Sequence, residues 1–282
     1  FIFDRDGVTL SACCRLKNEI TDREMLEKPE KLRFSGIQNV TINLPQCAYR
    51  TIQENNSRFK TTDRQELFNR FFQQIESTLK LVVKAHQEKK RFLKQMMVTP
   101  EGPLWQIGKI SPDGEPYVDL EKGTYLVGLI GLNEAMQFLT NYQLHENEET
   151  YSWGLKTVSF LHLKCNEYGK KYRIKLSLEE SPAESAAGRL AKIDLREFPE
   201  SKQVIKGSIP GDECYYTNSI HFAAAANMDL ISRIIKQSKF HPLIKSGAII
   251  HAFVGEKKPP AESIFNLLSK VWKNTLAAQI TI

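Results

Sequence analysis

The sequence predicts an α/β fold in which most strands are parallel, and two observations carry this prediction. From Thr124 onward, short apolar runs typical of strands alternate with longer segments of helical periodicity. Nearer the N-terminus, Val40, Ile42 and Leu44 alternate with polar residues, as one face of a strand does. With 282 residues, of which 41% are hydrophobic, the chain can build one large core or two closely joined domains.

The strand around residues 39–45 is followed by a long predicted helix, 62–97. Residues 62–65 (Thr-Asp-Arg-Gln) have the pattern of a capping box, and apolar residues then recur at helical spacing. Two prolines and a glycine within 100–103 end this helix. The next stretch, around residues 112–116, is predicted to form turns and a hairpin-like insertion.

Strands and helices alternate through the rest of the chain. One predicted helix opens at Ser181-Pro182-Ala183-Glu184, which combines a cap residue, a proline at the first helical position and a glutamate at the capping-box position. The chain ends in a segment, 279–282, that suits a strand. The other predicted strands are 125–129, 171–178, 215–219 and 247–254, and the other predicted helices are one that begins near Asn133, then 148–167, 228–239 and 260–273.

Composition and charge exclude several classes of protein. The net charge of +6 suits a phosphorylated substrate, but it is too small and too dispersed to indicate nucleic-acid binding. Five cysteines without regular spacing suit a reducing cytoplasm, and the lack of a Cys-x-x-Cys pair excludes a zinc site built from local spacing. The longest apolar runs, 125–132 and 247–254, are too short to cross a membrane. We therefore expect a cytoplasmic protein.

A vicinal cysteine pair, Cys13-Cys14, lies on a predicted loop just before the first of these strands. A thiol held on a loop against the rim of a sheet can carry radical or nucleophilic chemistry. The alternative is that both cysteines are small apolar fillers, which is the common role of such residues.

The junction near residue 180, between a strand and a helix, is a candidate phosphate site. Free backbone N–H groups and the helix dipole favour an anion there, and small side chains such as Ala183 and Ser185 would let it approach the backbone. Glu179, Glu180 and Glu184 crowd the same junction and would repel an anion if they faced it. Local chemistry leaves phosphate binding and a simple helix cap equally open.

Two further polar positions attract attention. Asn218, next to Ser219, is disfavoured in a strand, and hydrogen bonding to a sugar or to the loop with the cysteines would explain it. Asn133, at a predicted helix start, suits a cap. The six histidines show no metal-ligand spacing.

Several motifs together resemble one known family. The chain is similar to anaerobic (class III) ribonucleoside-triphosphate reductases, which are glycyl radical enzymes, and the motifs occur in the same order over nearly the whole chain. They are Cys13-Cys14-Arg15-Leu16, Asn39-Val40-Thr41-Ile42-Asn43-Leu44-Pro45, Gly128-Leu129-Ile130-Gly131-Leu132-Asn133-Glu134, Ser181-Pro182-Ala183-Glu184 with Arg189-Leu190-Ala191, Tyr215-Tyr216-Thr217-Asn218-Ser219 and His251-Ala252-Phe253-Val254-Gly255-Glu256.

The resemblance implies a fold and a reaction. The family fold is a ten-stranded α/β barrel made of two parallel half-sheets, with a finger loop that brings a radical cysteine into its centre. A glycyl radical, installed by a separate radical S-adenosylmethionine activating enzyme, oxidises that cysteine to a thiyl. The thiyl takes the 3′ hydrogen of a ribonucleoside triphosphate, the 2′ hydroxyl leaves as water, and a reductant completes the deoxynucleotide.

The resemblance also implies roles for individual residues. Some relatives have Gly-Cys-Arg where this chain has Cys13-Cys14-Arg15, so Cys14 is the thiyl candidate and Cys13 its neighbour. The junction from Ser181 through Ala183 and Glu184 to Ser185 would hold the triphosphate. Asn43, Asn218 and Ser219 would line the sugar pocket.

Some parts of the family pattern are missing from these residues. The glycyl radical loop, its zinc site and the N-terminal regulatory nucleotide domain of many members are not found. We therefore expect residues 1–282 to be a single catalytic barrel domain, incomplete at both ends and inactive alone. Formate is the expected reductant, because Cys47 lies beyond Pro45 and is poorly placed as a second active-site thiol. A homodimer is the expected assembly. The alternatives are a non-catalytic nucleotide-binding paralogue and another glycyl radical enzyme.

Overall fold

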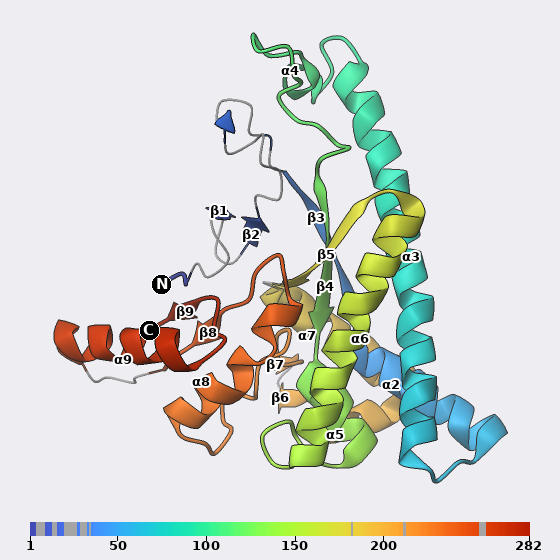
Figure 1. The fold of residues 1–282 in the computed structure, drawn as a ribbon. Coiled ribbons are helices and arrows are strands. Elements are labelled where there is room, and N and C mark those ends of the chain that lie inside the picture. The colour runs from blue at the N-terminus through green and yellow to red at the C-terminus, as the bar shows by residue number, and fades with distance from the viewer. Residues whose placement is uncertain are drawn as a thin grey trace.

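A three-stranded parallel sheet lies at the centre of the structure (Figure 1). The computed structural model describes residues 1–3, 9–12, 16–19, 27–28, 33, 35–181, 183–210, 213–253 and 258–282. Its strands are β1 (Thr9–Ala12), β2 (Leu16–Glu19), β3 (Gly36–Asn43), β4 (Thr124–Ile130), β5 (Lys175–Glu180), β6 (Lys206–Ser208), β7 (Glu213–Tyr215), β8 (Ile250–His251) and β9 (Ile280–Thr281). The α-helices are α2 (Leu44–Glu54), α3 (Arg64–Val98), α4 (Trp105–Gly108), α5 (Leu132–Thr140), α6 (Glu148–Tyr172), α7 (Glu184–Glu197), α8 (Leu230–Ser238) and α9 (Ala261–Asn274), and shorter helical turns are η2 (Asn55–Phe59), η3 (Pro199–Gln203) and η4 (His241–Leu243).

The central sheet has the order β3-β4-β5, with Thr41 level with Gly128 and Gly128 level with Glu179. The chain continues this sheet beyond β5, because Ser246 donates its backbone N–H to Leu178 and Glu180 donates to Gly247 (2.9 and 3.1 Å). Just after that segment, β8 pairs in parallel with β9. The strands of the central sheet and the pair β8-β9 are therefore parallel, as the predicted α/β architecture requires, whereas the short pairs β1-β2 and β6-β7 are antiparallel.

The two faces of the sheet differ in chemistry because side chains alternate along a strand. Ile42, Val127 and Leu178 lie on one face and are buried in the main hydrophobic core. This core also contains Phe71 of α3 and Leu161 of α6, and both helices run along the same side of the sheet in Figure 1. The opposite face carries polar side chains, which are described below with the candidate site.

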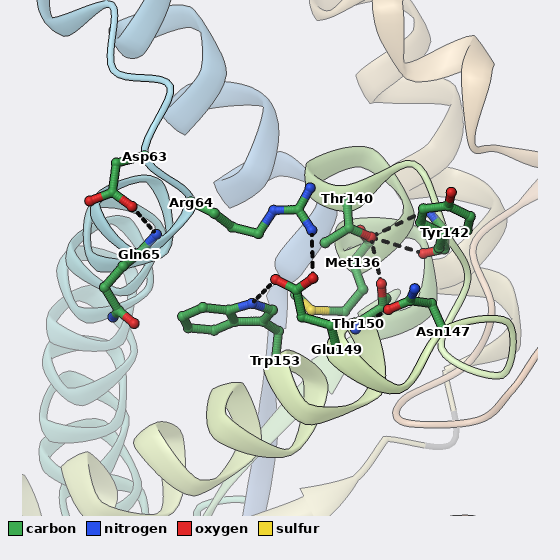
Figure 2. A network of polar contacts seen from close by, with 10 residues as sticks. All are labelled: Asp63, Arg64, Gln65, Met136, Thr140, Tyr142, Asn147, Glu149, Thr150 and Trp153. Atoms are coloured by element: carbon green, nitrogen blue, oxygen red, sulfur yellow. Dashed lines mark hydrogen bonds and ion pairs between the residues drawn. The ribbon is translucent and has the colours of Figure 1, made fainter.

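Helices α3 and α6 are joined near their N-terminal ends (Figure 2). Arg64 forms an ion pair with Glu149 (Nη1 to Oε2, 3.2 Å), and Glu149 also accepts a hydrogen bond from the Trp153 indole (3.4 Å). The Trp153 ring stacks on Phe68 of α3 at 3.9 Å between centroids. Asp63 caps α3 by accepting a hydrogen bond from the backbone N–H of Gln65 (3.0 Å). The predicted capping box has Thr62 as the N-cap, so the helix begins one residue later than predicted.

Many predicted elements are confirmed. The long helix, the buried strand β4, helices α8 and α9 and the terminal strand β9 lie within a few residues of their predicted bounds. The isolated bridge between Ile110 and Pro116 confirms the hairpin-like insertion. Within the described residues, no helix combines the length and the low charge that crossing a bilayer requires.

Two boundaries were predicted wrongly in the first part of the chain and around residue 173. Leu44 and Pro45 form the first turn of α2 and do not extend β3, because Asn43 acts as the N-cap. Helix α6 runs on to Tyr172, where Arg173 in the left-handed conformation (φ 54°) ends it, and β5 begins only at Lys175. The alternation from residue 171 to 178 therefore belongs partly to a helix.

Four further predictions were wrong, two about helix caps and two about strands. Helix α7 begins at Glu184 with Ala183 as its N-cap, so Ser181 does not cap it. Strand β7 ends at Tyr215, and residues 216–219 are irregular. Strand β8 is only two residues long. Asn133 likewise does not cap α5, whose N-cap is Gly131 in a left-handed conformation (φ 71°).

Candidate functional site

The polar face of the central sheet forms the first part of the candidate site. The hydroxyl oxygens of Thr41 and Ser181 lie 2.9 Å apart, and Asn39 donates a hydrogen bond to Glu179 (2.6 Å). Gly128 lies on β4, between β3 and β5. A Cβ atom at this position would collide with the side chains of Ser181, Asn39 and Thr41. Glycine is therefore required at the point where polar side chains from the neighbouring strands meet.

A buried carboxylate, Asp194 of α7, organises the end of β3. It accepts hydrogen bonds from Asn43 (2.8 Å), Gln46 (2.9 Å) and the Tyr216 hydroxyl (2.8 Å). The Tyr216 hydroxyl also lies 3.1 Å from that of Tyr49. Burial raises the pKa of Asp194, although the hydrogen bonds from Asn43, Gln46 and Tyr216 oppose this shift. This network ties α7 to the start of α2.

A second buried carboxylate, Glu134 of α5, holds the irregular segment 216–219. It accepts both the backbone N–H (3.0 Å) and the hydroxyl (2.6 Å) of Thr217, together with the Asn133 amide (3.1 Å). Burial raises the pKa of Glu134. In return, Gly131 and Leu132 donate their backbone N–H groups to Thr217 and Ser219 (3.0 and 3.3 Å). The segment is thus fixed by α5, although it is not a strand.

A cavity of about 620 Å³ lies beside this segment, between the start of α7, β6, α8 and β8. Its charged and polar lining includes Glu184, Lys206, Asn218, His221, Arg233 and His251. His221 Nδ1 accepts a hydrogen bond from the Gln237 amide nitrogen (3.3 Å), and the Nε2 atom of His221 lies 3.8 Å from Glu180 Oε2. The His221 and His251 rings are 5.3 Å apart. The cavity is large enough for a small-molecule ligand.

Helix α7 separates this cavity from a second, basic groove of about 610 Å³. Ser185, Arg189, Lys192 and Arg196 line the groove, and Glu184 borders both spaces. The first turn of α7 therefore faces two different surroundings.

The sequence-predicted site residues fall into separate clusters. Glu184 and Asn218 come together at the cavity, where the Asn218 amide donates to the carboxylate at 3.4 Å. Ser181 lies on the polar face of the sheet and Ser185 in the basic groove, while Ala183 caps α7 between them. Ser219, the last residue of the segment 216–219, is buried and has a left-handed backbone conformation (φ 46°). Cys13 and Cys14 lie outside the described residues.

Asn43 is placed differently from the predicted sugar pocket. Its amide nitrogen donates to Asp194, and its oxygen accepts the Gln46 N–H (3.3 Å) as the cap of α2. The Asn43 side chain was expected to contact the substrate. In the structure it instead holds Asp194 and caps α2.

A family profile matches the chain from residue 3 to residue 282, and its description is "Anaerobic ribonucleoside-triphosphate reductase". The chain belongs to this family. The match includes the segments that form the polar sheet face and the cavity.

Named reductases of this family align with about half of the chain. The anaerobic ribonucleoside-triphosphate reductase of Escherichia coli (strain K12) is 25% identical over 149 residues, which are 52% of this chain and 19% of that protein. The reductase of Salmonella typhimurium gives the same values. The aligned region thus spans about a fifth of the length of these relatives.

Solved anaerobic reductases share the fold. The Thermotoga maritima enzyme with MES in its active site matches 85% of this chain and 36% of its own, with a TM-score of 0.63 and 19% identity. The same enzyme in complex with dATP and CTP matches with a TM-score of 0.60, 19% identity and similar coverage (85% and 35%). These matches confirm the predicted fold, part of the reductase barrel.

Several residues of this candidate site were missed by sequence reasoning. Lys206, Arg233 and His221 come from segments without a recognised motif, and only the fold brings them to one cavity. Asp194 could have been suspected, because an aspartate on the inner face of an apolar helix needs hydrogen-bond partners. Within the described residues, no group of three or more His, Cys, Asp or Glu side chains could hold a metal ion.

Proposed function

We propose that this chain is the substrate-binding and thiyl-bearing part of an enzyme that reduces ribonucleoside triphosphates to deoxyribonucleoside triphosphates without oxygen. The family match over residues 3–282 is the observation that carries the proposal. The cavity beside Glu184 and Asn218, at the carboxyl end of the parallel strands, supports it, because ligands of α/β sheets bind at that end.

In this proposal Cys14 is the hydrogen-abstracting thiol and Cys13 its neighbour. The Ser181–Ser185 junction, with Ala183 and Glu184 at the start of α7, binds the triphosphate. Asn218 and Ser219 contact the sugar, and Asn43 holds the end of β3 through Asp194. A glycyl radical outside these residues supplies the oxidising equivalent that converts the cysteine to a thiyl.

The remaining participants are also part of the proposal. Formate is the reductant, and a radical S-adenosylmethionine enzyme is the activating partner. The complete protein is a cytoplasmic homodimer with a zinc site in its C-terminal region. The solved fold relatives include the Thermotoga maritima enzyme in complex with dATP and CTP, which supports nucleotide binding.

The test is deoxynucleotide formation by the complete gene product, activated under strict anaerobiosis and supplied with each ribonucleoside triphosphate. We expect turnover that depends on activation. A gene that continues without a glycine radical motif after a Cys-x-x-Cys pair, and a product that binds nucleotides without turnover, would instead support the non-catalytic paralogue.

A further inference from the structure

Arg233 is a buried cation whose hydrogen bonds go to neutral groups. Its side chain is on α8, and the residue is 8% exposed. The guanidinium donates to the backbone carbonyls of Phe222 (3.4 Å) and Ala223 (3.1 Å). No carboxylate forms an ion pair with it in the described part of the chain. Burial lowers the pKa of Arg233, but a guanidinium stays charged at neutral pH.

A buried charge without a counter-charge is costly, and the cavity is where a counter-charge could enter. Arg233 lines the cavity together with Lys206 of β6. The Lys206 ammonium donates to the Gln137 side chain at 2.8 Å, and it too has no ion pair between described residues. Two cations from distant segments therefore border one space.

The carboxylates around the cavity, Glu134, Glu180 and Glu184, each have other contacts. Glu134 is near Lys206 but accepts both hydrogen bonds of Thr217. Glu180 accepts the N–H of Ile249 (2.8 Å). Glu184 borders the cavity and accepts from Asn218. Among the described residues that line the cavity, Arg233 and Lys206 carry positive charge and Glu184 carries the one negative charge, so this lining favours an anion.

We propose that Arg233 and Lys206 form an anion subsite of this cavity, and that the anion is a phosphate group of the nucleoside triphosphate. The identity of the nucleotide rests on the proposed function, whereas the anion subsite stands on the cavity itself. The start of α7 borders the same space through Glu184 and Ala187, so its unpaired backbone N–H groups reinforce the two cations.

The test is binding of inorganic triphosphate and of ATP to the complete gene product without activation. Arg233→Gln and Lys206→Gln should each weaken the binding of both ligands by about tenfold, because each removes a charge-assisted contact. Binding of adenosine should not change. Lys236→Gln is the matched control, since Lys236 lies on the same helix and pairs with Glu148 outside the cavity lining.

Arg233→Lys shows whether weaker binding comes from the loss of the charge or from unfolding of the variant. It keeps the charge, so it should retain more triphosphate affinity than Arg233→Gln, while thermal melting shows whether each variant is folded. Folded Arg233→Gln and Lys206→Gln proteins that bind triphosphate as tightly as Lys236→Gln would overturn the subsite. If those losses occur but the activated enzyme makes no deoxynucleotide, the subsite stands and the proposed reaction fails.

Discussion

At the scale of single residues, the thiols in the described part of the chain are buried in apolar surroundings. Cys47, Cys165 and Cys214 are buried and free. Burial raises the pKa of Cys47 to about 11 and that of Cys165 to about 12, so both stay protonated and unreactive at neutral pH. Cys47 fills space in the main hydrophobic core, where its sulfur lies 3.6 Å from the Thr78 hydroxyl. These residues leave the pair Cys13-Cys14 as the candidate for chemistry.

The first prediction concerns that pair. In the activated complete protein, Cys14→Ser should abolish deoxynucleotide formation, because a serine O–H bond is too strong for a glycyl radical to open. Installation of the glycyl radical, measured by electron paramagnetic resonance, should be unaffected. Cys13→Ser should keep measurable turnover, and the reverse result would exchange the two assignments.

The second prediction concerns Asp194 and pH. Because burial raises its pKa in the folded protein, the folded state binds this proton more tightly than the unfolded chain does. The contribution of Asp194 to the free energy of unfolding therefore falls as pH rises between the unfolded value, about 3.9, and the raised folded value. Relative to Asp194→Asn, the wild-type protein should gain stability as pH is lowered from 7 towards 4.

Denaturant unfolding of both proteins at several pH values measures this difference. The contributions of the titratable groups that the two proteins share cancel in the comparison. A wild-type protein that loses stability relative to Asp194→Asn over the same range would show that the hydrogen bonds from Asn43, Gln46 and Tyr216 outweigh burial.

At the scale of elements, the start of α7 borders both candidate spaces for the proposed triphosphate. Asp is a favourable N-cap, so Ala183→Asp should not weaken the helix, yet its charge should repel phosphate at the start of α7. Ser185→Asp should act similarly, and both should reduce ATP affinity several-fold. Lys192→Asp should matter much less, as measured by calorimetry.

The comparison is informative because Ser185 and Lys192 line the same basic groove. If Lys192→Asp weakens binding as much as Ser185→Asp while Ala183→Asp does not, the triphosphate lies in the groove and not at the start of the helix.

Strand β4 provides the fourth prediction. Gly128→Ala should destabilise the fold by about 1–3 kcal/mol, because its Cβ would push apart Thr41, Ser181 and Asn39. Gly188→Ala is the control, since a Cβ there meets only the Cys214 carbonyl at 3.4 Å, and helix propensity should stabilise it by about 0.5–1 kcal/mol. Equal stability of the two variants in denaturant unfolding would show that the polar face adapts freely.

At the scale of the whole molecule, the sequence predicted the architecture better than the site. The spacing of apolar residues predicted the positions of α3, β4, α8 and α9. An element that is buried on one face, or on both, has a regular pattern of apolar residues in the sequence. The predicted strand 215–219 ends at Tyr215 in the structure, because Glu134 holds Thr217 in an irregular segment, a contact that local propensity cannot reveal. Arg233 and Lys206 were missed for the same reason, since only tertiary folding joins them to the cavity.

The fifth prediction concerns the reductant of the complete enzyme. We expect turnover with formate as the sole electron donor, and none with a reduced redoxin alone. Cys47 is buried and contacts Thr78, so it is not available as a second active-site thiol. Cys47→Ala should therefore leave formate-dependent turnover intact. Redoxin-dependent turnover that is lost in Cys47→Ala would contradict this prediction.

The clamp between Glu134 and Thr217 has a consequence for the energetics of binding. Fixing the backbone of one residue costs about 1–2 kcal/mol of conformational entropy. If residues 216–219 were free before binding, they would lose this entropy when a ligand arrived. Because α5 already holds Thr217 and Ser219 in place, this entropy is lost when the protein folds. Asn218 can thus meet a ligand with little further ordering, so nucleotide affinity should depend on contacts more than on the stiffening of a loop.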